Sequence, residues 1–131
     1  MIHLLDTNIC VPLINRTEPA LRERLLAQRP NDIVLCSVVK AELAFGARNS
    51  RHAAENLDRL QRFCSGFGSL SFDDAAAEHY GSVRAQLTRE GRLIGNNDLL
   101  IASIALATHS KLVTRNISEF SRVPGLDVEL W

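Results

Sequence analysis

The chain opens with a short apolar run that ends in a carboxylate. Residues 1–5 are almost entirely apolar, and Asp6, Thr7 and Asn8 follow them directly. This pattern indicates a short buried strand over Ile2–Leu5 with an acid at its carboxyl end. In open α/β sheets, ligands bind just beyond the carboxyl ends of the strands. Asp6 is therefore a candidate member of a metal-binding acidic cluster; an equally good interpretation is that it starts a turn or caps the next helix.

Apolar, strand-like runs alternate with helical patterns along the rest of the chain. Further strands are expected at Ile33–Cys36, Leu70–Phe72, Lys111–Thr114 and Val128–Leu130. Helices are expected between them, at about 9–14, 19–28, 37–47, 52–63, 73–90, 98–108 and 117–121, with Asn8, Ser37 and Asp73 as caps. This alternation implies crossover connections, and so a mainly parallel sheet with helices on both faces. The 131 residues fit one such α/β domain, 1–131.

Composition argues against several other classes of protein. The 15 basic and 15 acidic side chains cancel, so bulk charge gives no argument for a nucleic-acid partner. The 3 cysteines include no C-x-x-C pair, which argues against a disulfide framework or a zinc site and favours reduced cytosolic thiols. No apolar run approaches the roughly 20 residues of a membrane span, and the N-terminus lacks a signal-peptide pattern. The chain is therefore expected to be cytoplasmic, without a membrane partner.

Two further acids stand where surface acids are not expected. Glu42 lies on the helix after the second strand and shares a face with apolar neighbours such as Val38 and Phe45. Asp98 begins an apolar helix and shares its face with Ile101. Both acids also have simpler interpretations. Glu42 can pair with an arginine or face solvent, and Asp98 can complement the dipole of a helix start.

The three acids can converge at one edge of a right-handed parallel sheet. Two carboxylates ~4 Å apart repel by ~4 kcal/mol at an effective dielectric constant of about 20. Proteins relieve this repulsion by protonating one acid or by binding a cation. Oxygen ligands favour Mg²⁺ or Mn²⁺ over zinc, and a carboxylate site that keeps water suits phosphoryl chemistry. The sequence thus predicts a metal site formed by Asp6, Glu42 and Asp98.

Four short motifs contain these acids or follow them. They are Leu-Asp-Thr-Asn at 5–8, Ala-Glu-Leu at 41–43, Asn-Asp-Leu-Leu-Ile-Ala at 97–102 and Val-Thr-Arg-Asn at 113–116. In this order and spacing they resemble PIN-domain ribonucleases, and most of all the VapC toxins of bacterial toxin–antitoxin pairs. The resemblance covers the whole chain. It implies a PIN-like three-layer fold and an endoribonuclease that depends on Mg²⁺ or Mn²⁺.

The resemblance also implies roles for individual residues. The catalytic, metal-binding acids would be Asp6, Glu42 and Asp98. The hydroxyl groups close to them would belong to Thr7, Ser37 and Thr114. The metal would orient the scissile phosphate and activate a water that attacks in line, leaving a 5′-phosphate and a 3′-hydroxyl, with no covalent nucleophile from the protein.

Three residues near the C-terminal end of the pattern complete the expected site. Arg115 would hold a flanking phosphate of the RNA. Asn116 stands where many PIN domains carry a fourth acid, and this departure weakens a second metal position. Glu119 is a candidate substitute for that acid. Its other interpretation is structural, because Asn116-Ile117-Ser118-Glu119 resembles a capping box at a helix start.

Partners also follow from the resemblance. VapC toxins form homodimers, and each is silenced by a small VapB-type antitoxin that wraps the helices and reaches the acidic site. The first two helices and the 53–63 helix would supply the groove, with Phe63 and Phe67 as anchors. The substrates implied are structured RNAs, often a tRNA cut in the anticodon loop.

Two other functions stay open at this level. The first is a metal-dependent phosphatase or phospho-accepting domain with Asp6 as nucleophile, although such phosphatases usually need a second Asp where this chain has Asn8. The second is a catalytically inactive PIN-fold module that binds RNA or protein, which Asn116 makes conceivable. A phospho-aspartate trapped on Asp6 would support the first. The absence of metal-dependent RNA cleavage would support the second.

Overall fold

Five short strands form one sheet at the centre of the molecule. The computed structural model describes residues 1–131, and its strands are β1 (His3–Leu5), β2 (Ile33–Cys36), β3 (Gly68–Leu70), β4 (Lys111–Val113) and β5 (Val128–Glu129). Their order is β3-β2-β1-β4-β5, and each neighbouring pair is parallel. The expected parallel sheet is confirmed. All five strands therefore end at the same edge, with β1 in the middle.

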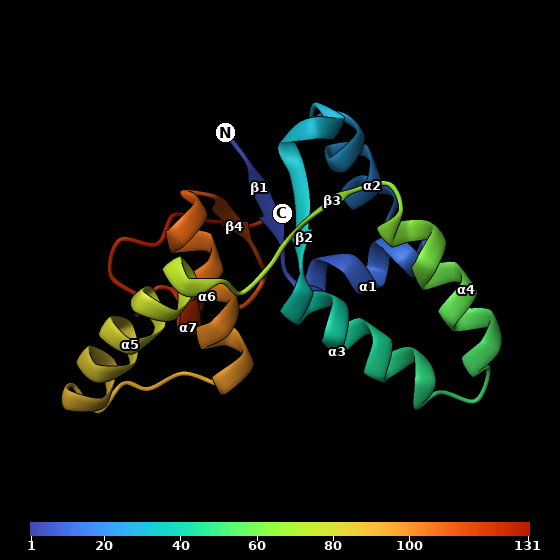
Figure 1. Cartoon of the computed structure of the whole chain (residues 1–131). Helices are drawn as coiled ribbons and strands as arrows, with labels where there is room; N and C mark the ends of the chain where they lie inside the picture. Colours follow the sequence, from blue (N-terminus) through green and yellow to red (C-terminus); the bar gives the residue numbers. More distant parts are fainter.

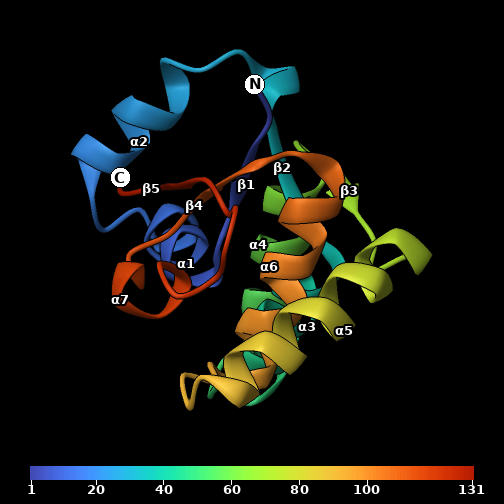
Figure 2. The same cartoon turned by 90° about the vertical axis from the view of Figure 1, so that its left-hand side faces the viewer.

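Helices cover both faces of this sheet. They are α1 (Thr7–Asn15), α2 (Pro19–Leu26), α3 (Ser37–Arg48), α4 (Ala53–Cys64), α5 (Asp74–Arg89), α6 (Asn96–Thr108) and α7 (Ile117–Phe120), with a short 3-10 turn at Pro30–Asp32. In Figure 1, α1–α4 lie on one side of the strands and α5–α7 on the other. The helices α5 and α6 pack against each other, and Figure 2 shows α5 crossing α6 obliquely. The three-layer α/β architecture is confirmed. None of these helices has the length and apolar character that crossing a membrane requires.

The core explains the apolar runs of the sequence. All four residues of β2 are buried, as expected for a strand covered on both faces. Helix α6 buries six residues, from Leu99 to Ala105, between the sheet and α5. All of them except Ser103 belong to one hydrophobic cluster of 25 buried side chains. The three central strands, β1, β2 and β4, are thus fixed mainly by the burial of their side chains.

The third strand differs from the sequence prediction. It was expected at Leu70–Phe72, but β3 spans Gly68–Leu70 and pairs with β2 from Val34↔Gly68 to Cys36↔Leu70. Phe72 lies beyond it and is exposed. β3 is an edge strand, held by backbone pairing on one side only. Gly68 and Ser69 are exposed, so the segment carries no alternation of apolar and polar residues that could reveal it.

Several helix starts also differ from the sequence prediction. Asn8 does not cap α1, because Asp6 does so. Ser37 is the first residue of α3 rather than its cap, since β2 turns into the helix at Cys36 without a side-chain cap. Helix α6 begins at Asn96, two residues before Asp98. At β1 and β2 the strand and the next helix are separated by one residue at most, so the cap is not the residue that the sequence suggested.

The long α5 helix has the expected ends. Asp73 caps it, because its Oδ1 accepts a hydrogen bond from the Ala76 N–H at 2.9 Å. Gly91, just beyond the C-terminus, has φ +65°, a left-handed conformation that glycine adopts without steric cost.

We predict that Phe120→Ala destabilises the protein by about 3–5 kcal/mol, because the substitution leaves a cavity in the core. Phe120 is 0% exposed and is the largest fully buried side chain, although α7 has only four residues. The free energy of unfolding in urea measures the effect. Phe45→Ala is the matched control, since Phe45 is 70% exposed and its removal should change stability little. Equal effects of the two substitutions would contradict the described packing of α7.

Candidate active site

Asp6 follows the central strand and is buried there, with 4% of its surface exposed. Its Oδ1 accepts the Thr7 N–H at 2.8 Å, and its Oδ2 accepts the Thr114 hydroxyl at 2.7 Å. Burial raises the pKa of Asp6; the bonds from Thr114 and Thr7 lower it, and the charges of Glu42 and Glu119 raise it again. The capping interpretation of Asp6 is therefore confirmed, and its role as a metal ligand stays a prediction. The side chain caps α1 with one oxygen and lies among other acids.

Thr114 connects Asp6 to the loop after β4. The residue is fully buried, and its hydroxyl donates to Asp6 while accepting the Asn116 N–H at 3.0 Å and the Asn8 Nδ2 at 3.3 Å. The Oδ1 of Asn8 in turn accepts the Arg115 N–H at 3.2 Å. Asn8 thus ties the start of α1 to the end of β4. The predicted proximity of Thr114 to the acids is confirmed by these contacts.

Glu42 reaches the same edge of the sheet from α3. Its Oε1 accepts the Thr7 hydroxyl at 2.7 Å, and its Oε2 lies 3.5 Å from the Nδ2 of Asn97. No arginine pairs with it, so that half of the simpler interpretation is wrong; the side chain is partly exposed, so the other half, a solvent-facing position, is not contradicted. The expectation that Phe45 shares a buried face with Glu42 is also wrong, because Phe45 is 70% exposed. The buried stripe of α3 consists of Val39 and Leu43 alone.

Asp98 and Glu119 meet across the start of α6. The Nδ2 of Asn116 donates to Asp98 Oδ2 at 3.2 Å and also to Glu119 Oε2. The Oε1 of Glu119 accepts the Gly95 N–H at 2.9 Å. The capping-box interpretation is wrong, because the Asn116 side chain caps nothing in α7. The geometry instead brings Glu119 beside Asp98, where a fourth acid was missing.

The electrostatics of this pair are unusual. The pKa of Asp98 is raised from 3.8 to about 7 by burial, by its hydrogen bond with Glu119, and by the charges of Asp6, Glu119 and Glu42. The pKa of Glu119 is lowered, first by the hydrogen bond with Asp98 and then by the Gly95 N–H. The pair therefore shares one proton at pH values below about 7.

The side chains of two predicted site residues form no hydrogen bond with the acids. Ser37 is exposed at the first position of α3 and forms no hydrogen bond with any of the acids. The Arg115 side chain turns to Glu18, which precedes α2, and forms two hydrogen bonds of 2.8 and 2.6 Å with its carboxylate. The sequence alone gives no sign of this ion pair, because the two residues are 97 positions apart.

The acids are bound by neutral groups and not by cations. None of the ion pairs in the structure includes Asp6, Glu42 or Asp98. As placed, no three acidic, histidine or cysteine side chains form a ready chelate for a metal ion. The donor set is nevertheless oxygen-only and carries surplus negative charge, which fits a hard divalent cation. Mg²⁺ commonly binds to one or two carboxylates and keeps several waters, so it does not need three carboxylates in direct contact.

The sequence of this chain is similar to those of known proteins over almost its whole length. The family model described as PIN domain matches residues 3–126. Ribonuclease VapC2 of Rickettsia felis is 42% identical over 132 residues, covering 100% of this chain and 98% of its own length. The tRNA(fMet)-specific endonuclease VapC of Shigella flexneri is 39% identical over 128 residues, covering 98% of this chain and 96% of its own.

A solved structure agrees with the sequence relatives. The crystal structure of VapBC2 from Rickettsia felis bound to a DNA fragment from their promoter matches with a TM-score of 0.94 at 42% identity. The match covers 100% of this chain and 99% of that one. The arrangement of strands and helices that brings the acids together is thus shared over the whole length.

We predict that Thr114→Val destabilises the protein by about 1–3 kcal/mol, because a buried Asp6 oxygen and the Asn116 N–H lose their partner. Thr114→Ser keeps the hydroxyl and loses only a methyl group, so its effect should be clearly smaller. Thermal and urea unfolding of the two variants measure the difference. Equal losses in both would mean that the methyl group, and not the hydrogen bonds, makes the contribution.

We also predict that the metal-free protein loses stability between about pH 4 and pH 7. Asp98 keeps its proton in this range when folded and releases it when unfolded, so the free energy of unfolding falls as the pH rises. The substitution Asp98→Asn should flatten this decline, whereas Asp74→Asn, at an exposed position of α5, should not. Urea unfolding over this pH range in the presence of a chelator measures the slope. An unchanged slope in Asp98→Asn would contradict the raised pKa.

Proposed function

This chain belongs to the PIN domain family, as a VapC ribonuclease toxin of a VapBC toxin–antitoxin system, and from this premise we propose that it is a Mg²⁺- or Mn²⁺-dependent endoribonuclease that cuts a tRNA. The observation that carries the proposal is the convergence of Asp6, Glu42, Asp98 and Glu119 at one edge of the sheet without a basic partner for the first three. The tRNA(fMet) endonuclease among the relatives supports a tRNA substrate.

The residues proposed to hold the cation are Asp6, Glu42 and Asp98, with Glu119 as the fourth acid in place of Asn116. When bound, a divalent cation supplies charge neutralisation at the scissile phosphate and makes water a better nucleophile at neutral pH. The products are then a 5′-phosphate and a 3′-hydroxyl, because the water oxygen joins phosphorus and the 3′ oxygen leaves with a proton.

The other side chains fix the acids in place and adjust their charge. Thr7 holds two acids at once, since its N–H binds Asp6 and its hydroxyl binds Glu42. The raised pKa of Asp98 and the lowered pKa of Glu119 allow the pair to share one proton, which reduces its charge before substrate arrives. Glu18 uses two N–H groups of Arg115, and a guanidinium has five, so Arg115 can still donate to a flanking phosphate.

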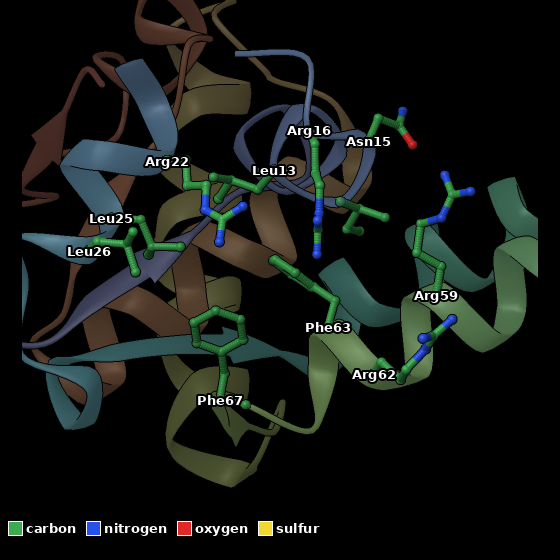
Figure 3. A pocket seen from close by; sticks show the side chains of 12 residues that line it. Leu13, Asn15, Arg16, Arg22, Leu25, Leu26, Arg59, Arg62, Phe63 and Phe67 are labelled. Atoms are coloured by element: carbon green, nitrogen blue, oxygen red, sulfur yellow. The ribbon is translucent and has the colours of Figure 1, made fainter. Parts of the chain in front are cut away.

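A VapB-type antitoxin is the proposed partner, and a groove of about 670 Å³ is its proposed binding site. Its floor is apolar, and Figure 3 shows Phe63 and Phe67 facing Leu25 and Leu13 across it. Its rim carries four arginines: Arg16, Arg22, Arg59 and Arg62. An amphipathic segment with apolar anchors and acidic flanks complements this surface. The two anchors named from the sequence lie in this groove.

We further propose that the toxin acts in the cytoplasm as a homodimer. The chain leaves large apolar side chains uncovered outside the groove, Phe45 at 70% and Leu93 at 45% exposure. Surfaces of this kind commonly contact another chain.

The alternative functions are less well supported. A phosphatase with Asp6 as nucleophile would usually need a second Asp two residues later, but that position is Asn8, whose amide binds Thr114 and the Arg115 N–H. An inactive binding module was suggested by Asn116, yet Glu119 supplies a carboxylate beside it. The set of acids therefore favours a nuclease.

We expect purified toxin to cleave total tRNA only when Mg²⁺ or Mn²⁺ is present, with chelator stopping the reaction and added metal restoring it. Asp6→Asn should lower the rate by about 10²–10³-fold or more, because a preorganised charged group is lost. Asp74→Asn is the matched control and should cleave like wild type. On expression in bacteria, growth arrest should be relieved by Asp6→Asn and by the neighbouring antitoxin gene. Metal-independent cleavage, or full activity of Asp6→Asn, would contradict the proposal.

A further inference from the structure

A second cleft, of about 370 Å³, lies between α1, α3 and α4. One end of it is formed by Thr7 and Glu42, which also belong to the acid site. Its other end reaches Ile14 and Asn15, where the arginine-rimmed groove begins. The cleft therefore starts at the place where a scissile phosphate would lie.

The walls of this cleft are apolar and face each other. Val11 and Ile14 line it from α1, and Leu43 from α3. Gly46 leaves the α3 wall open, since a Cβ added there would meet nothing within 4 Å. Flat aromatic groups bind well between such walls, because both of their faces are then removed from water.

Few polar side chains line the cleft, and all of them are neutral except Glu42 at its mouth. The amides of Asn15 and Asn56 line the cleft. The Nδ2 of Asn56 donates to the Ser50 hydroxyl at 2.8 Å, while its carbonyl oxygen accepts no hydrogen bond inside the chain. Side-chain amides and carboxylates can bind the donor and acceptor edges of a nucleobase, as they do in other nucleic-acid complexes.

The charge of the lining side chains indicates whether the cleft suits a base or a phosphate of the RNA. No lysine or arginine lines this cleft, and the carboxylate of Glu42 lies at its mouth. A phosphate placed inside would meet no positive charge, so the cleft cannot hold the RNA backbone. The neighbouring groove, with four arginines, has the opposite character and suits an acidic partner. A neutral, flat group with hydrogen-bonding edges fits the cleft best.

We propose that this cleft receives one unpaired base of the RNA substrate, from the nucleotide next to the bond that is cut. The inference rests on the proposed nuclease function and adds a specificity site to it. Proteins that read single-stranded RNA take unstacked bases into pockets of this kind. Occupation by the base would also align its phosphate with Glu42 and Thr7. Sequence preference at the cut would then come from α1, α3 and α4 rather than from the acids.

The test is a helix glycine substitution with a matched control. Gly46→Leu fills the cleft, whereas Gly81→Leu makes the same change in α5, where a Cβ also meets nothing within 4 Å. With a single-stranded RNA containing the cut site, Gly46→Leu should lower kcat/KM by roughly 5- to 150-fold, the range for losing one stacked base. It should also flatten the preference for the base beside the cut, and Gly81→Leu should do neither. Gly46→Leu and Gly81→Leu proteins that cleave alike would overturn the proposal.

A binding measurement separates this inference from the nuclease proposal. The four 5′-nucleoside monophosphates, titrated in turn into ¹⁵N-labelled protein, should shift the side-chain amide signals of Asn15 and Asn56 in wild type and in Asp6→Asn. Gly46→Leu should abolish the shifts. If wild type cleaves RNA in a metal-dependent way and no nucleotide shifts these signals, the nuclease proposal holds and the base site is wrong. If Gly46→Leu weakens only the binding of an antitoxin peptide, the cleft belongs to the antitoxin and the proposal is again overturned.

Discussion

Repulsion between carboxylates is the constraint on which the rest of this structure depends. Asp6, Glu42, Asp98 and Glu119 come from four different elements to one edge of the sheet, and each accepts hydrogen bonds only from hydroxyl or amide groups there. A basic side chain would relieve the repulsion at once, but the site would then have no remaining charge with which to bind a cation. Neutral donors keep the acids oriented and leave most of their charge available. The cost appears in the raised pKa values of Asp6 and Asp98.

The parallel sheet is what makes this arrangement possible. Every strand ends at the same edge, so β1 and β4 place Asp6 and Thr114 side by side although they are 108 residues apart. The strands have only two to four residues, and burial of their side chains holds the central three, β1, β2 and β4. Because β1 is followed almost immediately by α1, the residue that caps this helix also lies at the edge of the sheet. Asp6 combines capping with its place in the acid cluster for this reason.

The sequence predicted what depends on local pattern and missed what depends on distant partners. Buried strands and the helix carrying Asp98 were visible as apolar periodicity, and the motifs located the three main acids. The local pattern at Asn116 and Glu119 resembled a capping box, but the Gly95 N–H, 24 residues away, binds Glu119 instead. Likewise, Arg115 turns toward Glu18, a choice that only the tertiary structure defines. Edge strand β3 escaped detection because backbone pairing, and not side-chain burial, maintains it.

Helix α1 connects the acid cluster and the cleft to the arginine-rimmed groove. Its first residue, Thr7, holds two acids, and its last residues, Ile14 and Asn15, line both the cleft and the arginine-rimmed groove. Nine residues of α-helix span roughly 13 Å, so an extended peptide of about four residues covers the distance from groove to acids. A partner seated in the proposed antitoxin groove would therefore reach the catalytic edge by running along the cleft. The substrate base and the antitoxin would compete for the same cleft, and inhibition would require no change in the position of any acid.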